Sequence, residues 1–283
     1  MSQSALSPSL QAPRARGFLL LLASVALWGF APIGNRYFIG PTHLGFPAAS
    51  YMALRYAIAA FCFTPGVIVA LRSWSGRDWL RGAVCGFAGV SIYNLLAGVA
   101  ARSVSAGMAG LLNSTETLMI LLLGCLIARR APGMRTIFAA LLGAAGIALL
   151  AASSGPAEGS VGGILMLLGA ASGWAVYCVL IPPLIKKHGA LQCSAVTMFL
   201  GTMPLLLLGG AGLPAMVHLL TGWDWAFALG LAIGGSVVAL IAWNKGVAEL
   251  GAQTASWFLY LLPVFSALGA VSYTHLRAHE TVL

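Results

Sequence analysis

The sequence predicts an all-α membrane protein, a polytopic helical bundle, and three observations lead to this fold class. Of the 283 residues, 60% are hydrophobic and only 7% are charged, and the mean hydropathy is +0.93. Apolar stretches long enough to cross a bilayer recur along the chain. The connections between these stretches are short. A soluble core cannot bury so much apolar surface in so short a chain, whereas lipid solvates it.

Nine apolar stretches are long enough to cross about 30 Å of hydrocarbon at about 1.5 Å per residue. They cover residues 17–38, 47–71, 81–101, 105–127, 134–152, 161–184, 192–212, 224–244 and 252–271. Residues 1–16 form a polar tail that is too poor in apolar residues to be the core of a signal peptide, and no small-residue cleavage site follows. We therefore expect the first span to be retained.

The lysines and arginines predict the orientation of the spans. With the N-terminus inside, only Arg36 and Arg102 fall on the outer side. Eleven fall on the inner side: Arg14, Arg16, Arg72, Arg77, Arg81, Arg129, Arg130, Arg135, Lys186, Lys187 and Lys245. This asymmetry follows the positive-inside rule, so we predict a cytoplasmic N-terminus. It also explains the net charge of +9, which forms no basic patch, and we expect no nucleic-acid partner.

A weak internal repeat divides the chain. At an offset of 146 residues, "GFLLLLASVALWG" (17–29) lies over "GILMLLGAASGWA" (163–175) and matches Trp28 with Trp174. We predict two repeats, 17–152 and 161–271, joined by the linker 153–160. Because a repeat of five spans is odd, the second copy enters the membrane from the opposite side. Inverted repeats of this kind are typical of secondary transporters, whose substrate site lies near the midplane between the halves.

Three motifs resemble the EamA-type members of the drug/metabolite transporter superfamily. They are "LWGFAPIGNRYF" (27–38), "ALRYAIA" (53–59) and "GVAELGAQTASWFLYLLPVFSALGA" (246–270). The resemblance implies ten helices in two five-helix halves, in a carrier of the bacterial inner membrane. It further implies export of an amino acid or another small metabolite, drug-like compounds included. It implies no ATP-binding domain and no cofactor.

The end of the chain departs from this family pattern. Where a tenth span is expected, the chain reads "VSYTHLRAHETVL" (271–283), whose charged residues and histidines cannot cross hydrocarbon. We expect residues 272–283 to be a non-native tail on a truncated chain, so that the second repeat holds four helices.

A cluster of polar residues lies at depth in the predicted bundle. Counted from the outer ends of their helices, Glu116 is about 16 Å deep, Arg55 about 12 Å and Asn94 about 10 Å. A lone charge at mid-bilayer costs at least about 2.5–3.5 kcal/mol, so Arg55 and Glu116 should face the interior. Asn113 lies three residues before Glu116 and therefore shares its helical face.

This cluster has three interpretations. Arg55 and Glu116 form a buried pair that locks the second and fourth spans together, without a ligand. Alternatively, Glu116 is a substrate or proton site. In the third interpretation the register is different and Arg55 extends to the membrane interface.

Aromatic residues within the spans are further candidates for the substrate pathway. Trp28, Tyr93, Trp174 and Tyr177 lie inside predicted spans rather than at the interfaces, where such residues usually collect. Each is a packing residue in the simpler interpretation. Pro263 interrupts its predicted helix and can free backbone carbonyls for a ligand, or merely kink the helix.

No sequence feature indicates catalysis or a metal site. The five histidines are scattered in loops or in the suspect tail, and no HExxH, GxSxG or nucleotide-binding motif occurs. The expected partners are therefore the lipid bilayer and a small-molecule substrate, with protons and a second copy of the chain left open. A non-transporting membrane subunit or receptor is the alternative function, and an intramembrane enzyme fits less well because the loops are short and bare.

Overall fold

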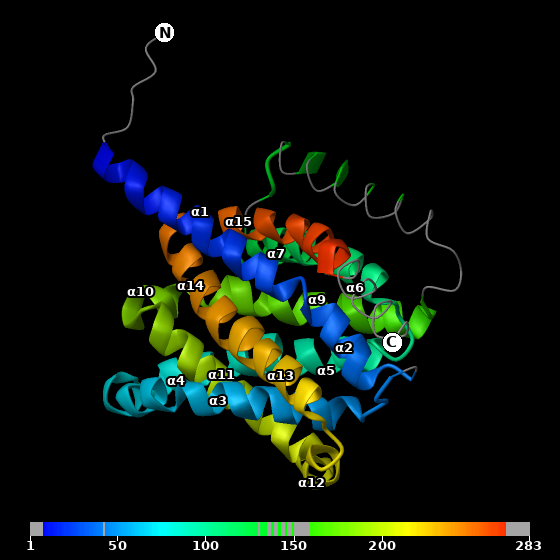
Figure 1. The fold of residues 1–283 in the computed structure, drawn as a ribbon. Coiled ribbons are helices and arrows are strands. Elements are labelled where there is room, and N and C mark those ends of the chain that lie inside the picture. Colours follow the sequence, from blue (N-terminus) through cyan, green and yellow to red (C-terminus); the bar gives the residue numbers. More distant parts are fainter. Residues whose placement is uncertain are drawn as a thin grey trace.

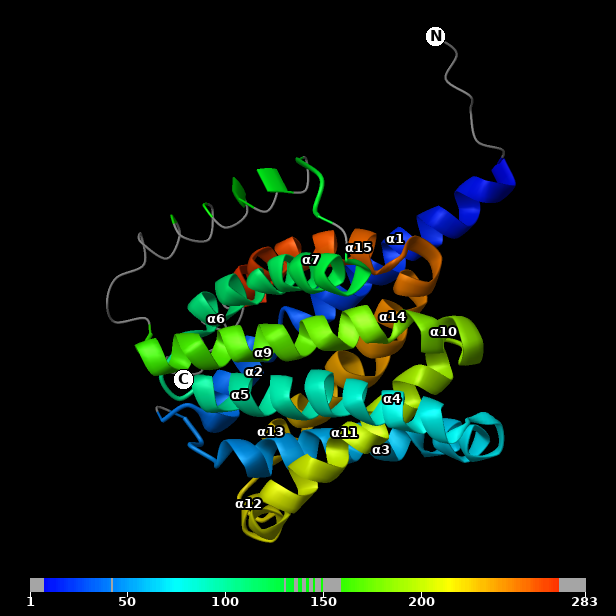
Figure 2. The same ribbon diagram turned by 180° about the vertical axis from the view of Figure 1, so that it is seen from behind.

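The structure is a computed structural model that describes residues 8–41, 43–129, 131–134, 137–138, 141–142, 145, 149 and 159–269. These residues are nearly all helical and contain no strand, apart from one isolated bridge between Val104 and Gly159. Figures 1 and 2 show the helices gathered in one bundle. The all-helical polytopic fold is thus confirmed.

The helices of the first half follow the predicted spans and are broken in places. They are α1 (Pro8–Trp28), α2 (Ala31–Ile39), α3 (Ala48–Ser73), α4 (Gly76–Gly86), the π-helical segment η1 (Phe87–Ile92), α5 (Tyr93–Ala100), α6 (Ala106–Asn113) and α7 (Thr115–Ala128). α1 begins nine residues before the predicted span, so part of the predicted tail is helical, and Arg16 pairs with Glu249 at 3.6 Å.

The second half is likewise helical. It contains α9 (Val161–Leu180), α10 (Pro182–His188), α11 (Ala190–Gly209), η3 (Gly210–Gly212), α12 (Leu213–Val217), α13 (Gly222–Gly230), the π-helical segment η4 (Leu231–Val238), α14 (Ala239–Leu250), α15 (Ala252–Ser256) and η5 (Trp257–Leu261). Helical backbone continues over residues 262–269.

Seven helical segments of the described residues are long and apolar enough to cross a membrane: Arg14–Ile39, Ala48–Ser73, Gly76–Ala100, Ala106–Ala128, Val161–Leu180, Ala190–Val217 and Gly222–Leu250. Each matches one of the nine predicted spans. Most of the predicted fifth span, most of the linker and the tail at 272–283 lie outside the described residues, and the predicted ninth span is helical up to residue 269.

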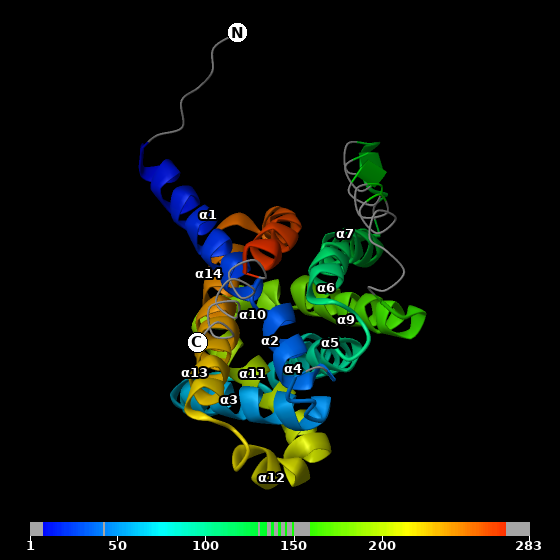
Figure 3. The ribbon, with the colours of Figure 1, turned by 45° about the vertical axis from the view of Figure 1, so that its right-hand side comes forward.

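Glycines allow the helices to approach closely. α11 packs along α3 and α4, and Figure 3 shows α1 beside α14. A Cβ atom at Gly86 would clash with the carbonyl oxygen of Thr197, and one at Gly173 would lie 2.6 Å from that of Ala88. The sequence has three pairs of glycines four residues apart, Gly82 and Gly86, Gly169 and Gly173, and Gly230 and Gly234. Gly86 and Gly173 are tightly packed, whereas Gly230 has no atom within 4 Å of its Cβ position. Packing therefore explains two of these motifs.

Gly86→Ala is expected to lower the stability of the protein by about 1–3 kcal/mol, because the added methyl group has no room and the backbone of α11 cannot move aside easily. Thermal unfolding in detergent measures the change. Gly230→Ala is the matched control, since its methyl group meets open space. Equal melting temperatures for the two variants would contradict the close contact of α4 with α11.

Two local features recur 146 positions apart, the offset of the repeat. Ser75 and Asp78 form a reciprocal cap at the start of α4, and Thr221 and Asp224 form the same cap at the start of α13. Each of these helices runs into a π-helical segment, and η1 and η4 end at matching positions. π-Helical turns often occur at functional sites.

Candidate functional site

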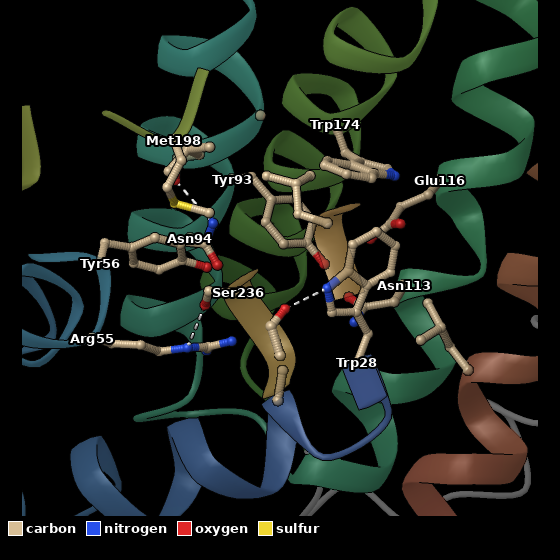
Figure 4. A pocket seen from close by; sticks show the side chains of 16 residues that line it. Trp28, Arg55, Tyr56, Tyr93, Asn94, Asn113, Glu116, Trp174, Met198 and Ser236 are labelled. Atoms are coloured by element: carbon tan, nitrogen blue, oxygen red, sulfur yellow. Dashed lines mark hydrogen bonds between the residues drawn. The ribbon is translucent and has the colours of Figure 1, made fainter. Parts of the chain in front are cut away.

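A cavity of about 560 Å³, counting the space at its mouth, lies inside the bundle (Figure 4). Its walls come from both halves, and both π-helical segments contribute to them. Seven of the nine predicted site residues line it: Trp28, Arg55, Tyr93, Asn94, Asn113, Glu116 and Trp174. The tertiary structure therefore brings together residues that the sequence only placed at similar depths.

Arg55 supplies a buried cation to the cavity. The side chain projects from α3 and the residue is 2% exposed. Its Nε donates a hydrogen bond to Ser236 Oγ at 3.1 Å, whereas one terminal nitrogen, Nη1, has no partner in the protein. The guanidinium carbon lies 5.3 Å from the ring centroid of Tyr56, at cation–π distance. The arginine side chain is thus held in place, and its Nη1 can still donate hydrogen bonds to a ligand.

Glu116 supplies a buried carboxylate. The predicted fourth span is interrupted at Ser114, so Glu116 lies in the first turn of α7. A helix N-terminus favours negative charge there. The residue is 2% exposed, and its Oε1 has no hydrogen-bond partner. The side chain of Tyr93 lies within hydrogen-bonding reach of the carboxylate.

Arg55 and Glu116 do not pair, so the first interpretation of this cluster is wrong. Among the described residues the ion pairs involve Arg16, Lys187 and His188, and none joins Arg55 to Glu116. The two side chains lie on opposite sides of the cavity (Figure 4). The sequence predicted the depths of the two residues. It did not predict that η4 packs beside α3 and that Ser236 of η4 binds Arg55. The third interpretation is also wrong, because Arg55 is buried within the bundle.

The asparagines extend the polar lining towards a second cavity. Asn94 donates a hydrogen bond from Nδ2 to the carbonyl oxygen of Val90 in η1 at 2.9 Å. Asn94 and Asn113 line both cavities, and the second continues to Ala101 and Ser105 at the connection between α5 and α6. The two cavities share Ala31, Tyr93, Asn94 and Asn113 in their linings and are therefore neighbours.

Tryptophans form the apolar wall. Trp28 and Trp174, which occupy matching positions in the two halves, meet edge to face with ring centroids 5.1 Å apart. Trp28 Nε1 donates to the carbonyl oxygen of Gly235 in η4 at 2.8 Å. Tyr93 lies 5.8 Å from the ring of Trp174, whose own Nε1 has no partner.

Two of the predicted site residues do not line the cavity. Tyr177 is fully buried behind Trp174, on which it stacks at 4.9 Å, and its hydroxyl accepts a hydrogen bond from Asn244 at 2.7 Å. Pro263 is half-buried in the helical segment 262–269, and its neighbour Leu262 reaches the cavity instead.

Nine lining residues were not predicted from the sequence, and Tyr56, Met198 and Ser236 are three of them. The signal for Tyr56 was its position next to Arg55 in an apolar helix. Ser236 follows two glycines in a segment that was expected to be an ordinary apolar span. The sequence shows neither the π-helical turn nor the bond to Arg55.

Metal ligation has no support in the part of the chain that the structure describes. No group of three or more His, Cys, Asp or Glu residues there could hold a metal ion. The five cysteines, all within the described residues, are free thiols and form no disulfide.

A model of the EamA-like transporter family matches residues 15–152 and 161–277 of this chain. The chain belongs to the EamA-like transporter family. It is thereby a member of the drug/metabolite transporter superfamily, and the resemblance seen in the motifs is confirmed. The two matched segments correspond closely to the two predicted repeats.

This EamA-like transporter is 29% identical over 248 residues to the uncharacterized transporter YdfC of Bacillus subtilis, covering 86% of this chain and 78% of the relative. It is also 29% identical over 250 residues to a probable terminal-alkyne amino-acid exporter of Streptantibioticus cattleyicolor, covering 86% and 80%. A solved crystal structure aligns with a TM-score of 0.63 at 21% identity, covering 93% of this chain and 88% of that one, and supports the fold alone.

These names point to a transporter rather than an enzyme. Together with the seven apolar helices they make the protein a multi-pass membrane protein of the EamA type. It therefore resides in a lipid bilayer and binds small-molecule substrates.

Proposed function

We propose that this protein is a secondary transporter of the bacterial plasma membrane that exports a small zwitterionic metabolite, of the amino-acid class, by alternating access. One observation carries the proposal. The central cavity holds one buried cation and one buried carboxylate that do not pair with each other, and each has an atom without a hydrogen-bond partner. Unpaired buried charges are costly, so a ligand with both charges would satisfy this site.

The ends of an amino acid fit the two sides of the cavity. The free Nη1 of Arg55 is a donor for a carboxylate, and guanidinium–carboxylate hydrogen bonds are among the strong ones in proteins. The free Oε1 of Glu116 is an acceptor for an ammonium group. The aromatic rings of Trp28, Tyr93 and Trp174 offer an apolar surface for the side chain of the substrate.

Alternating access is supported by the repeat. The offset of 146 residues relates the paired tryptophans, the two capped helices and the ends of the two π-helical segments. A site between such halves can open to either side by rocking of one half against the other. The basic residues favour a cytoplasmic N-terminus. Exchange of protons through Glu116 and assembly as a homodimer stay predictions.

Counterflow in proteoliposomes tests the function. Vesicles loaded with an unlabelled amino acid are expected to take up the same labelled amino acid, across a panel that covers aromatic, aliphatic and polar side chains. Two analogues of each substrate serve as competitors: the decarboxylated amine and the deaminated acid. We expect the zwitterion to compete best, because only it carries both charges. Failure to transport any zwitterion of the panel would contradict the proposal, and so would competition by both analogues as strong as that by the zwitterion.

A further inference from the structure

Asp78 links the two halves at one end of the bundle. The Nζ of Lys187, at the end of α10, lies 2.6 Å from Asp78 Oδ2, and Nε2 of His188 lies 3.2 Å from the same oxygen. Asp78 also closes the cap of its own helix by accepting a hydrogen bond from Ser75 Oγ at 2.7 Å. We call Asp78, Lys187 and His188 the inner cluster, after the orientation that the basic residues predict.

Asp224 links the halves in the same way. The hydroxyl of Tyr37, in α2, donates to Asp224 Oδ1 at 2.5 Å. Asp224 closes its own cap by accepting a hydrogen bond from Thr221 Oγ1 at 2.6 Å. We call Tyr37 and Asp224 the outer cluster. Each aspartate therefore caps a helix of its own half and binds a residue of the other half, which is Lys187 between two spans for Asp78 and Tyr37 near the end of the first span for Asp224.

The two clusters lie at opposite ends of α3. The ring of His188 stacks on Trp74, directly after the end of α3, at 4.6 Å. Phe38, next to Tyr37, stacks on Tyr51 in the first turn of α3 at 4.5 Å. The 26 residues of α3 span about 39 Å, close to the thickness of a bilayer. Figure 2 likewise shows α4 and α10 together at one end of the bundle and α12 at the other.

We propose that the inner and outer clusters are the two gates of the transporter, related by the same repeat that relates its halves. Each cluster holds the halves together at one face, and each must separate before the cavity opens on that face. Both are formed in this structure. The inference rests on the proposed alternating access and adds the residues that control it.

The chemistry of the two gates differs, which makes them separable. Lys187 and Asp78 form a charge-assisted bond that Lys187→Met removes, while the cap at Ser75 is kept. Tyr37→Phe removes only the phenolic hydroxyl and keeps both the ring and the cap at Thr221. Ser75→Ala and Thr221→Ala are the matched controls, because they weaken the caps and leave the bonds between the halves.

Side-specific labelling tests the gates. In a variant whose five native cysteines are replaced, Ala31→Cys places a reporter thiol in the cavity. A membrane-impermeant maleimide is applied to either face of oriented vesicles, without substrate. The exposed positions Arg77 and Arg102, each changed to Cys in separate variants, mark the faces of the inner and outer clusters.

Tyr37→Phe is expected to raise the labelling rate about threefold to tenfold from the outer face only, as for the loss of one hydrogen bond. Lys187→Met is expected to do the same from the inner face only. An unchanged labelling rate, or an equal rise from both faces, would overturn the inference. The same side-specific pattern in Ser75→Ala and Thr221→Ala would also overturn it, since the aspartates would then serve only as helix caps.

Labelling also separates the gates from the transport function. If the gate variants show the side-specific labelling but the protein transports no substrate of the counterflow panel, the proposed function is contradicted and the inference about the gates is not. If the protein transports a substrate of the panel but the gate variants have unchanged labelling rates, only the inference about the gates is contradicted.

Discussion

Arg55→Gln is expected to reduce the affinity for a zwitterionic substrate about tenfold to a hundredfold, because it removes the buried cation that faces the substrate carboxylate. The neutral amide retains hydrogen-bonding capacity but cannot offset a carboxylate charge in a desolvated cavity. Binding of labelled substrate to the purified protein measures the change.

A substrate analogue makes this test specific. The decarboxylated amine lacks the group that Arg55 is proposed to bind, so the variant should bind it about as well as the native protein does. This pairing of a variant with an analogue isolates one contact, as in a double-mutant cycle. Arg16→Gln is the matched control, since Arg16 lies outside the cavity and pairs with Glu249 at the surface. Equal loss of affinity for zwitterion and amine would show that Arg55 supports the fold of the site instead.

Glu116→Gln is expected to produce the complementary defect: weaker binding of the zwitterion by a similar factor and unchanged binding of the deaminated acid. The carboxylate has a free oxygen in a buried site, and the amide cannot balance an ammonium charge. Glu249→Gln is the matched control because this carboxylate lies outside the cavity. If Glu116→Gln and the control Glu249→Gln lower the affinity for the zwitterion equally, Glu116 has no specific role in recognition.

The same variant tests proton exchange. If Glu116 carries the proton, Glu116→Gln abolishes transport driven by a pH gradient, while counterflow at saturating substrate and equal pH persists. The fluorescence of a pH-sensitive dye inside the vesicles reports the proton flux. Unchanged dependence on the pH gradient in the variant would rule out Glu116 as the proton carrier.

Much of the fold was predictable because hydrocarbon imposes simple rules. Length and apolarity marked each of the seven described spans, and a weak repeat indicated how the halves correspond. Breaks within spans were not predictable. The interruption at Ser114 and the π-helical segments η1 and η4 occur in apolar stretches that read as continuous helix. In η4 the carbonyl oxygen of Gly235 accepts a hydrogen bond from Trp28 of α1, and such a contact between helices has no local signal.

The candidate site was predicted in part for a related reason. A charge at depth must face the interior, so Arg55 and Glu116 could be chosen from the cost of exposing them to lipid. Their partners could not be chosen, because depth says nothing about the rotation of a helix or about which neighbour fills the space. Ser236 and the bond from Tyr37 to Asp224 therefore emerged only from the packed helices.

The sequence by itself determined that this is a helical membrane protein of the EamA type, since composition, span length and motifs are properties of the chain. It also determined which polar groups must avoid lipid. Only the tertiary structure decided that Arg55 and Glu116 face each other across a cavity instead of pairing, and that Asp78 and Asp224 join the halves at opposite ends. The physical reason is that solvation by lipid acts on each residue separately, whereas pairing depends on distances between helices far apart in sequence.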